Sequence, residues 1–117
     1  MERTFIEVPL FTSKWKQLGL TDEDLFQLQD FLLLNPDAGK IMQGTGGIRK
    51  LRFALGSTGK SGGIRICYVD FEEYEVIHLI TAFAKSEQEN LTSEEKAILK
   101  KLVKSLCDET ARRHHHE

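Results

Sequence analysis

The stretch Gln43–Val69, QGTGGIRKLRFALGSTGKSGGIRICYV, is the part of the chain from which fold and function can both be approached. From Ala38 to Val69 there is no acidic residue, yet the span holds six of the chain's 16 Lys and Arg. Subtraction leaves 10 basic and 18 acidic residues elsewhere, a net charge of −8, although the 117-residue chain has a formal charge of −2. A positive segment in an acidic body indicates a binding surface for a polyanion.

The first half of this stretch predicts a strand with one charged and one apolar side. In Ile48–Phe53, Lys50 and Arg52 alternate with Leu51 and Phe53. Alternate side chains of a strand share a face. We therefore expect the two cations to project together while the two apolar side chains enter a core.

The second half predicts a partner strand, reached through a Gly-rich turn at Gly56–Gly63. In Ile64–Val69, Ile64, Ile66 and Tyr68 would face one way, and Arg65 would share the other side with Cys67 and Val69. Paired as a hairpin, the strands would bring Arg65 near Arg52 and Lys50. Like charges side by side are unfavourable, so an anion is expected between them.

The turn itself contains Gly59-Lys60-Ser61, which invites comparison with a phosphate-binding P-loop. The P-loop frame G-x-x-x-x-G-K-[ST] needs a glycine five residues before Gly59, and that position is Ala54. The segment also leads into a strand rather than a helix. We interpret it as a hairpin turn in which Lys60 can contact RNA.

Three motifs, GTGGIRKLRF, GKSGGIRICYV and ITAFAKSE, together resemble the RelE superfamily of bacterial toxins, most closely its HigB-type branch. The resemblance covers Phe5–Leu106, nearly the whole chain. It implies a ribosome-dependent mRNA endonuclease that is held inactive by a cognate antitoxin. This antitoxin is expected to be a helix-turn-helix protein encoded nearby. No cofactor and no metal ion are implied.

The implied chemistry is attack by an mRNA 2′-OH on the adjacent phosphate. We assign Arg65 to the scissile phosphate, because arginine has a planar fork that matches two phosphate oxygens. Lys50 and Arg52 would stabilise the added charge, and a crowded lysine can have its pKa lowered enough to act as a base. Arg49 and Lys60 are expected to bind RNA.

The sequence identifies the general acid less clearly than it identifies the phosphate-binding cations. In several family members a tyrosine beyond the third strand takes part in catalysis, but Ser86–Leu91 contains none. Lys85 follows the third strand, at the place where the family carries basic catalytic residues. It is our candidate to take the role of the missing tyrosine. Glu87 and Glu89 are a further possibility, although solvated charge near a helix start is the simpler interpretation.

The rest of the chain predicts an α+β fold in the order strand, helix, helix, three strands, helix. We expect an antiparallel sheet with helices on one side. The mostly apolar run Tyr74–Phe83 nevertheless indicates a strand covered on part of both faces. The remaining expected elements are a strand at Thr4–Val8, a helix at Phe11–Leu18, a helix capped by Thr21 and ended by Asn35-Pro36, and a last helix opened by the capping box at Thr92–Glu95.

By length the chain is one domain, residues 1–110, with a tail at 111–117 that is either native or a purification tag. No apolar run approaches the length of a membrane span and no signal peptide is visible, so we expect a cytoplasmic protein without membrane contact.

Cys67 and Cys107 are interpreted as reduced, packed thiols, and His78 as a packed, hydrogen-bonded side chain. Trp15 and Tyr68 are expected in the core.

Two other functions remain open from the sequence. One is a catalytically inactive RelE-like module that only binds nucleic acid or a protein partner. The other is a metal-independent ribonuclease acting on free RNA, against which the lack of a convincing His/Glu pair argues.

Overall fold

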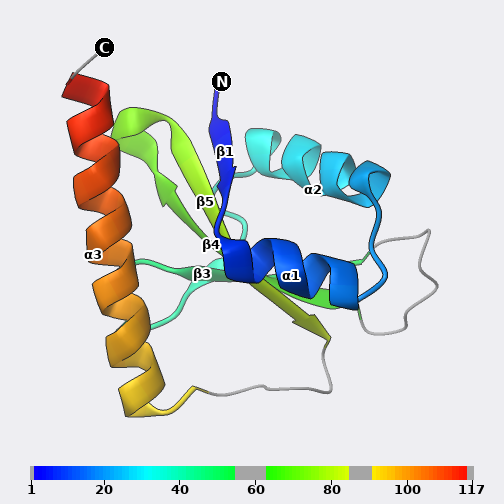
Figure 1. Cartoon of the computed structure of the whole chain (residues 1–117). Coiled ribbons are helices and arrows are strands. Elements are labelled where there is room, and N and C mark those ends of the chain that lie inside the picture. The colour runs from blue at the N-terminus through cyan, green and yellow to red at the C-terminus, as the bar shows by residue number, and fades with distance from the viewer. Residues whose placement is uncertain (1, 55–62, 85–90, 116–117) are drawn as a thin grey trace.

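The computed structural model describes residues 2–54, 63–84 and 91–115. Its elements confirm the α+β class and the predicted order, with one short strand, β2, that the sequence did not reveal (Figure 1). They are β1 (Thr4–Glu7), α1 (Pro9–Gln17), α2 (Asp22–Leu34), β2 (Lys40–Ile41), β3 (Arg49–Phe53), β4 (Ile64–Phe71), a 3₁₀ turn η1 (Glu72–Tyr74), β5 (Val76–Ala84) and α3 (Ser93–His115).

The strands form one five-stranded sheet in the order β1-β5-β4-β3-β2. The pairs from β2 to β5 are antiparallel, but β1 runs parallel to β5. The expected antiparallel sheet is therefore wrong at β1. Short turns force neighbouring strands to be antiparallel, whereas β1 and β5 are separated by two helices and three strands, so no short turn sets their relative direction.

Helices cover both faces of the sheet, so the expectation of helices on one side is also wrong. Figure 1 shows the sheet between α3 on one side and α1 with α2 on the other. Both sides of β4 and β5 carry apolar residues, as the uninterrupted hydrophobicity of β5 had indicated. The core under α1 and α2 includes Phe11, Trp15, Leu28, Leu32, Leu51, Ile66, Tyr68 and Leu79, and the core under α3 consists of Ile48, Cys67, Val69, Ile80 and Val103.

Two helices begin at capping boxes, in which the first residue and a carboxylate three positions later exchange hydrogen bonds. At α2, the Asp24 backbone N–H donates to Thr21 Oγ1 at 3.1 Å, and the Thr21 N–H donates to Asp24 Oδ2 at 2.9 Å. Thr92 and Glu95 exchange the same pair of bonds at 3.1 and 2.9 Å before α3. Both helix starts therefore lie where the sequence placed them.

Helix α3 runs further than the sequence indicated. We set residues 111–117 apart as a tail, but the helix continues through His115. An ion pair between Arg113 Nη2 and Glu109 Oε1, 2.8 Å apart and one turn apart on the helix, lies in this last part. Among the described helices, none is both long enough and apolar enough to cross a membrane.

The C-terminal half of α3 is held to the sheet by a buried histidine. The Thr110 hydroxyl donates to the Leu106 carbonyl oxygen at 2.7 Å, so its oxygen is left to accept from His78 Nε2–H at 3.1 Å. His78 is 4% exposed, and its Nδ1 is buried without a hydrogen-bond partner among the described residues. The prediction of a packed, hydrogen-bonded histidine is confirmed.

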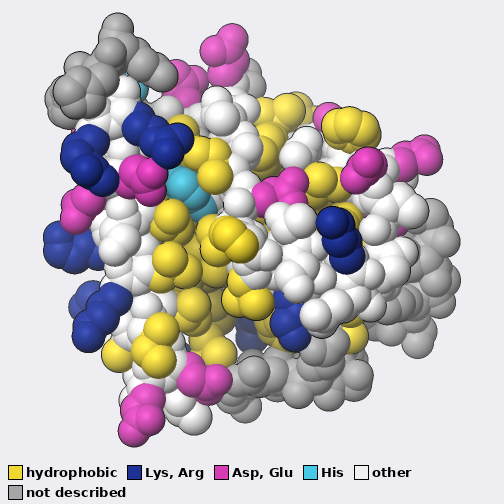
Figure 2. Space-filling view, viewed as in Figure 1, with side chains coloured by type: hydrophobic (Ala, Val, Ile, Leu, Met, Phe, Trp, Pro, Cys, Tyr) yellow, Lys and Arg dark blue, Asp and Glu magenta, His cyan; other side chains and the backbone are white. Residues whose placement is uncertain are grey.

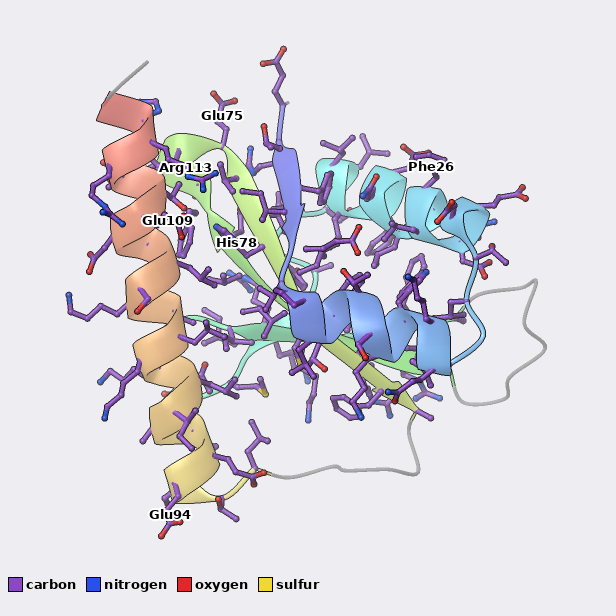
Figure 3. The ribbon with its side chains drawn as sticks, viewed as in Figure 1. Phe26, Glu75, His78, Glu94, Glu109 and Arg113 are labelled. Carbon is purple, nitrogen blue, oxygen red and sulfur yellow. The ribbon has the colours of Figure 1, made fainter. Side chains whose placement is uncertain are left out.

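This environment favours the neutral imidazole. Burial lowers the pKa of His78, the nearby carboxylate of Glu109 opposes that shift, and the Arg113 guanidinium adds to it. Figure 3 shows Glu109 and Arg113 on the turns of α3 next to His78. Because Nδ1 has no hydrogen-bond partner among the described residues, a proton placed there would be a buried donor without an acceptor.

We therefore predict that acidification weakens the fold through His78. The unfolded chain binds this proton near the ordinary histidine pKa of about 6.5 and the folded chain only at lower pH, so stability is lost as the pH falls below that value. Urea unfolding at pH 7.5 and pH 5.5 should show a smaller pH dependence for His78→Gln than for the parent. The tail histidines are present in both proteins, so an equal pH dependence would contradict the prediction.

Candidate active site on the basic face of the sheet

The pairing of β3 with β4 places the predicted cations together. Arg52 lies directly opposite Arg65, and Lys50 lies opposite Cys67. Residues directly opposite each other in a sheet share a face, and so do residues two apart in one strand. Lys50, Arg52 and Arg65 therefore project from the same side, which confirms the predicted register.

Strand β2 adds a fourth cation that the sequence did not assign. Lys40 pairs with Lys50, so it extends the charged surface across the edge of the sheet. We call Lys40, Lys50, Arg52 and Arg65 the basic cluster. A two-residue strand has no alternation to recognise, so only its place in the sheet shows that Lys40 belongs here.

The basic cluster shares its face with α3. Cys67, across from Lys50, belongs to the core beneath that helix, whereas Leu51 and Ile66 lie in the core beneath α1 and α2. Arg52 is exposed, and Lys50 and Arg65 are half-buried. The charges are therefore held on rigid strands and remain accessible from one side.

The electrostatics of the basic cluster favour an anion. Opposed like charges across a strand pair destabilise a sheet, and the Arg52–Arg65 pair is such an arrangement. A phosphate between the two guanidinium groups can accept hydrogen bonds from both forks. The paired guanidinium groups of Arg52 and Arg65 are therefore a candidate site for a phosphate group.

Arg49 lies apart from the basic cluster, although it is next to Lys50 in sequence. Its Nη1 donates to the carbonyl oxygens of Asp37 at 3.2 Å and Gly39 at 2.7 Å. It pairs across the sheet with Tyr68, so it projects from the opposite face. The structure gives Arg49 a role in holding the loop before β2, and its RNA-binding role stays a prediction.

Tyr68 holds the same loop from the core. Its hydroxyl donates to the Pro36 carbonyl oxygen at 2.8 Å and accepts from the Gly39 N–H at 3.0 Å. Burial raises the pKa of the Tyr68 phenol, so the hydroxyl keeps its proton for this bond. Tyr68 and Trp15 are buried, which confirms that both are core side chains.

Three predicted residue sets fall outside the described residues. They are Lys60 in the predicted hairpin turn, Lys85 beyond β5, and the Glu87/Glu89 pair. Their proposed roles stay predictions from the sequence and from the family resemblance.

A cavity of about 420 Å³ opens beside the basic cluster, between the sheet and the first turns of α3. Most of its lining is aliphatic, and Figure 2 shows hydrophobic side chains gathered between α3 and α1. Its lining residues are Leu10, Lys14, Met42, Ile48, Lys50, Cys67, Ile80, Thr81, Phe83, Leu91, Glu95, Ile98 and Leu99.

The cavity brings in two polar side chains that sequence reasoning missed. Lys14 belongs to α1, to which the sequence assigned no site residue, and Thr81 of β5 lies in the run interpreted as a mostly apolar strand. No local sequence signal marks either residue, because their positions depend on how α1 packs against the sheet edge. Both face the same cavity as Lys50.

The cavity floor also contains a cysteine. Cys67 and Cys107 are free thiols, as expected. Burial raises the pKa of Cys67 to about 11, although the neighbouring Lys50 ammonium opposes that shift. The thiol is therefore protonated at neutral pH and behaves as a packing group rather than a nucleophile.

Comparison with known proteins agrees with this fold. Residues 10–115 match the family described as the RelE toxin of the RelE/RelB toxin-antitoxin system. The protein belongs to this family, so it is a toxin of a toxin-antitoxin system, and the resemblance seen in the sequence is confirmed.

A solved structure of a mutant of E. coli toxin RelE in the free state is similar in fold. The TM-score is 0.55 at 18% sequence identity, with 84% of this chain and 96% of that chain covered. At this identity the likeness concerns the fold alone.

We predict that nucleic-acid binding through the basic cluster depends steeply on salt. With four phosphate contacts, the log-log slope of affinity against salt should be about −3 for a single strand. Lys40→Gln should make the slope less steep by about 0.7, because one contact is lost. Fluorescence anisotropy with a 2′-deoxy oligonucleotide measures this, and Arg112→Gln on the exposed end of α3 is the control. A flat salt response would exclude this face as the contact surface.

Proposed function

We propose that this toxin is an endoribonuclease that cleaves mRNA on the ribosome and so inhibits translation. The observation that carries the proposal is the direct opposition of Arg52 and Arg65, with Lys50 on the same face. Family membership supports the same activity, because toxins of this family are generally endoribonucleases.

The proposed reaction is a transfer within the RNA backbone. The 2′-oxygen forms a bond to the adjacent phosphorus, and the bond from phosphorus to the 5′-oxygen of the next nucleotide breaks. A base takes the 2′-OH proton and an acid protonates the leaving 5′-oxygen, which leaves a 2′,3′-cyclic phosphate and a 5′-OH. No cofactor enters this balance.

Each cation then has a proposed role. Arg65 binds the scissile phosphate through its fork, and Arg52 across the strand pair stabilises the charge that builds on the phosphate oxygens. Lys50 is the proposed base, and Lys85 is the proposed partner for the leaving group. Lys40 extends the binding surface along the RNA backbone.

A second function is supported by one observation in the sequence. The segment Ser86–Leu91 lacks the tyrosine used by several members of the family. A chain that kept the basic face but lost its acid would bind RNA or a partner without turnover. Cleavage of ribosome-bound mRNA by the purified protein separates the two functions, and cleavage of naked RNA would indicate a free ribonuclease instead.

The proposed antitoxin gives a test in cells. We predict that induced expression of this chain alone slows growth. Co-expression of a neighbouring helix-turn-helix protein should restore growth, and that protein should co-purify with the toxin. The physical reason is that a cationic surface of this kind must be covered or distorted when the toxin is silent. Harmless expression of the folded chain without any partner would contradict the toxin activity.

The sharpest test concerns Arg65. We predict that Arg65→Ala lowers ribosome-dependent cleavage by about 10²-fold, the usual loss for one transition-state donor. Arg65→Lys should restore only part of the activity, because a point charge cannot replace the bidentate fork. Arg112→Ala, which removes an exposed arginine at the far end of α3, should leave cleavage unchanged.

Circular dichroism of all three variants checks that the fold is intact. Arg65 is half-buried and belongs to neither core cluster, so its truncation should leave the core packing in place. A folded Arg65→Ala protein that cleaves mRNA as fast as the parent would remove Arg65 from the active site.

A further inference from the structure

Apart from Lys50, the side chains that line the cavity beside the basic cluster have no role in the proposed chemistry. Its volume of about 420 Å³ lies within the range of about 300–1,000 Å³ that small-molecule sites occupy. Such sites are mostly apolar with a few polar groups that orient the ligand. Here the polar groups are Lys14, Lys50, Thr81 and Glu95, in a largely aliphatic lining.

The sheet register relates the cavity to the phosphate site. Cys67 lies opposite both Lys50 and Thr81, so these three form one row across the cavity floor. Arg65 lies opposite both Arg52 and Phe83, which form the next row. Rows two residues apart on one face are separated by about 6.6 Å. That distance is close to the separation between the phosphorus of a nucleotide and its own base.

The lining suits a flat, weakly polar group. Phe83 and Ile80 from β5 and Ile98 and Leu99 from α3 bound the cavity from different elements. A planar base can pack its faces against such side chains and present its edge to the Thr81 hydroxyl. Base contacts with apolar and aromatic side chains contribute to single-strand binding without requiring a fixed sequence.

We propose that this cavity is a nucleobase subsite, which takes one base of the RNA while the phosphate of the same nucleotide lies on Arg52 and Arg65. The proposal rests on RNA being the substrate, and it adds the part of the substrate that is bound beyond the phosphate. A nucleotide satisfies both properties of the site, its apolar lining and its two lysines. An apolar side chain of a protein partner would satisfy only the first.

The test uses nucleoside monophosphates, because they cannot be cleaved and need no ribosome. Titrate the protein with AMP, CMP, GMP and UMP, and with ribose 5-phosphate, which has the same charge but no base. Methyl NMR signals of Ile80, Ile98 and Leu99 report on the cavity. At least one nucleotide should bind about tenfold more tightly than ribose 5-phosphate and shift these signals.

Two filling variants and one matched control locate the effect. Ile98 is 67% exposed at the mouth of the cavity, so Ile98→Trp adds volume there with little risk to folding. Thr81→Leu fills the cavity from its floor and removes the hydroxyl. Ala97→Trp makes the same change as Ile98→Trp on a neighbouring exposed position of α3 that does not line the cavity. The preference for the nucleotide should vanish in both filling variants and persist in the control.

The proposal is overturned if no nucleotide binds more tightly than ribose 5-phosphate, or if the preference survives in both folded filling variants. It is also overturned if the cavity signals move only when an antitoxin is added, since the cavity would then be a partner site. Ribosome-dependent cleavage is measured separately. Absence of cleavage with the base preference intact would refute the endonuclease activity and leave the base subsite standing.

Discussion

Every property of the basic face depends on the register between β3 and β4. Leu51 lies opposite Ile66 and Phe53 opposite Ile64, and these apolar pairs pack toward α1 and α2. A slip of one residue would turn Arg52 toward this core and expose Leu51, because alternate side chains point to opposite faces. Burial of the apolar pairs thus holds the Arg52–Arg65 pair in place, even though two opposed arginines disfavour that pairing by themselves.

The second constraint is that one face of the sheet serves two purposes. The C-terminal half of α3 is fixed by apolar packing around Val103 and by the His78–Thr110 hydrogen bond. Its N-terminal turns stand over the cavity instead, with Ile98 exposed at the mouth. The attachment of the C-terminal half of α3 therefore keeps its N-terminal turns beside the basic cluster, although a cavity rather than a packed core lies beneath those turns.

Much of this could be predicted from the sequence, since alternation in β3 and β4 and the capping residues Thr21 and Thr92 are local signals. The direction of β1 could not, because parallel pairing across two helices is decided by how the whole sheet assembles. Lys14 and Lys40 were missed for a related reason, since each reaches the site only through tertiary packing. Arg49 shows a further limit: its place in a basic run predicted an RNA contact, which stays a prediction, but nothing in the run predicted its hydrogen bonds to the carbonyl oxygens of the preceding loop.

The two-residue strand β2 also limits how other chains can meet this side of the molecule. An exposed sheet edge invites another strand to extend the ladder, and short edges with lysine discourage this. At β2 an incoming strand would find only Lys40 and Ile41, and its hydrogen-bonded ladder would be correspondingly short. A partner strand that paired with β2 alone would therefore gain few backbone hydrogen bonds, and its recognition there would depend on side chains.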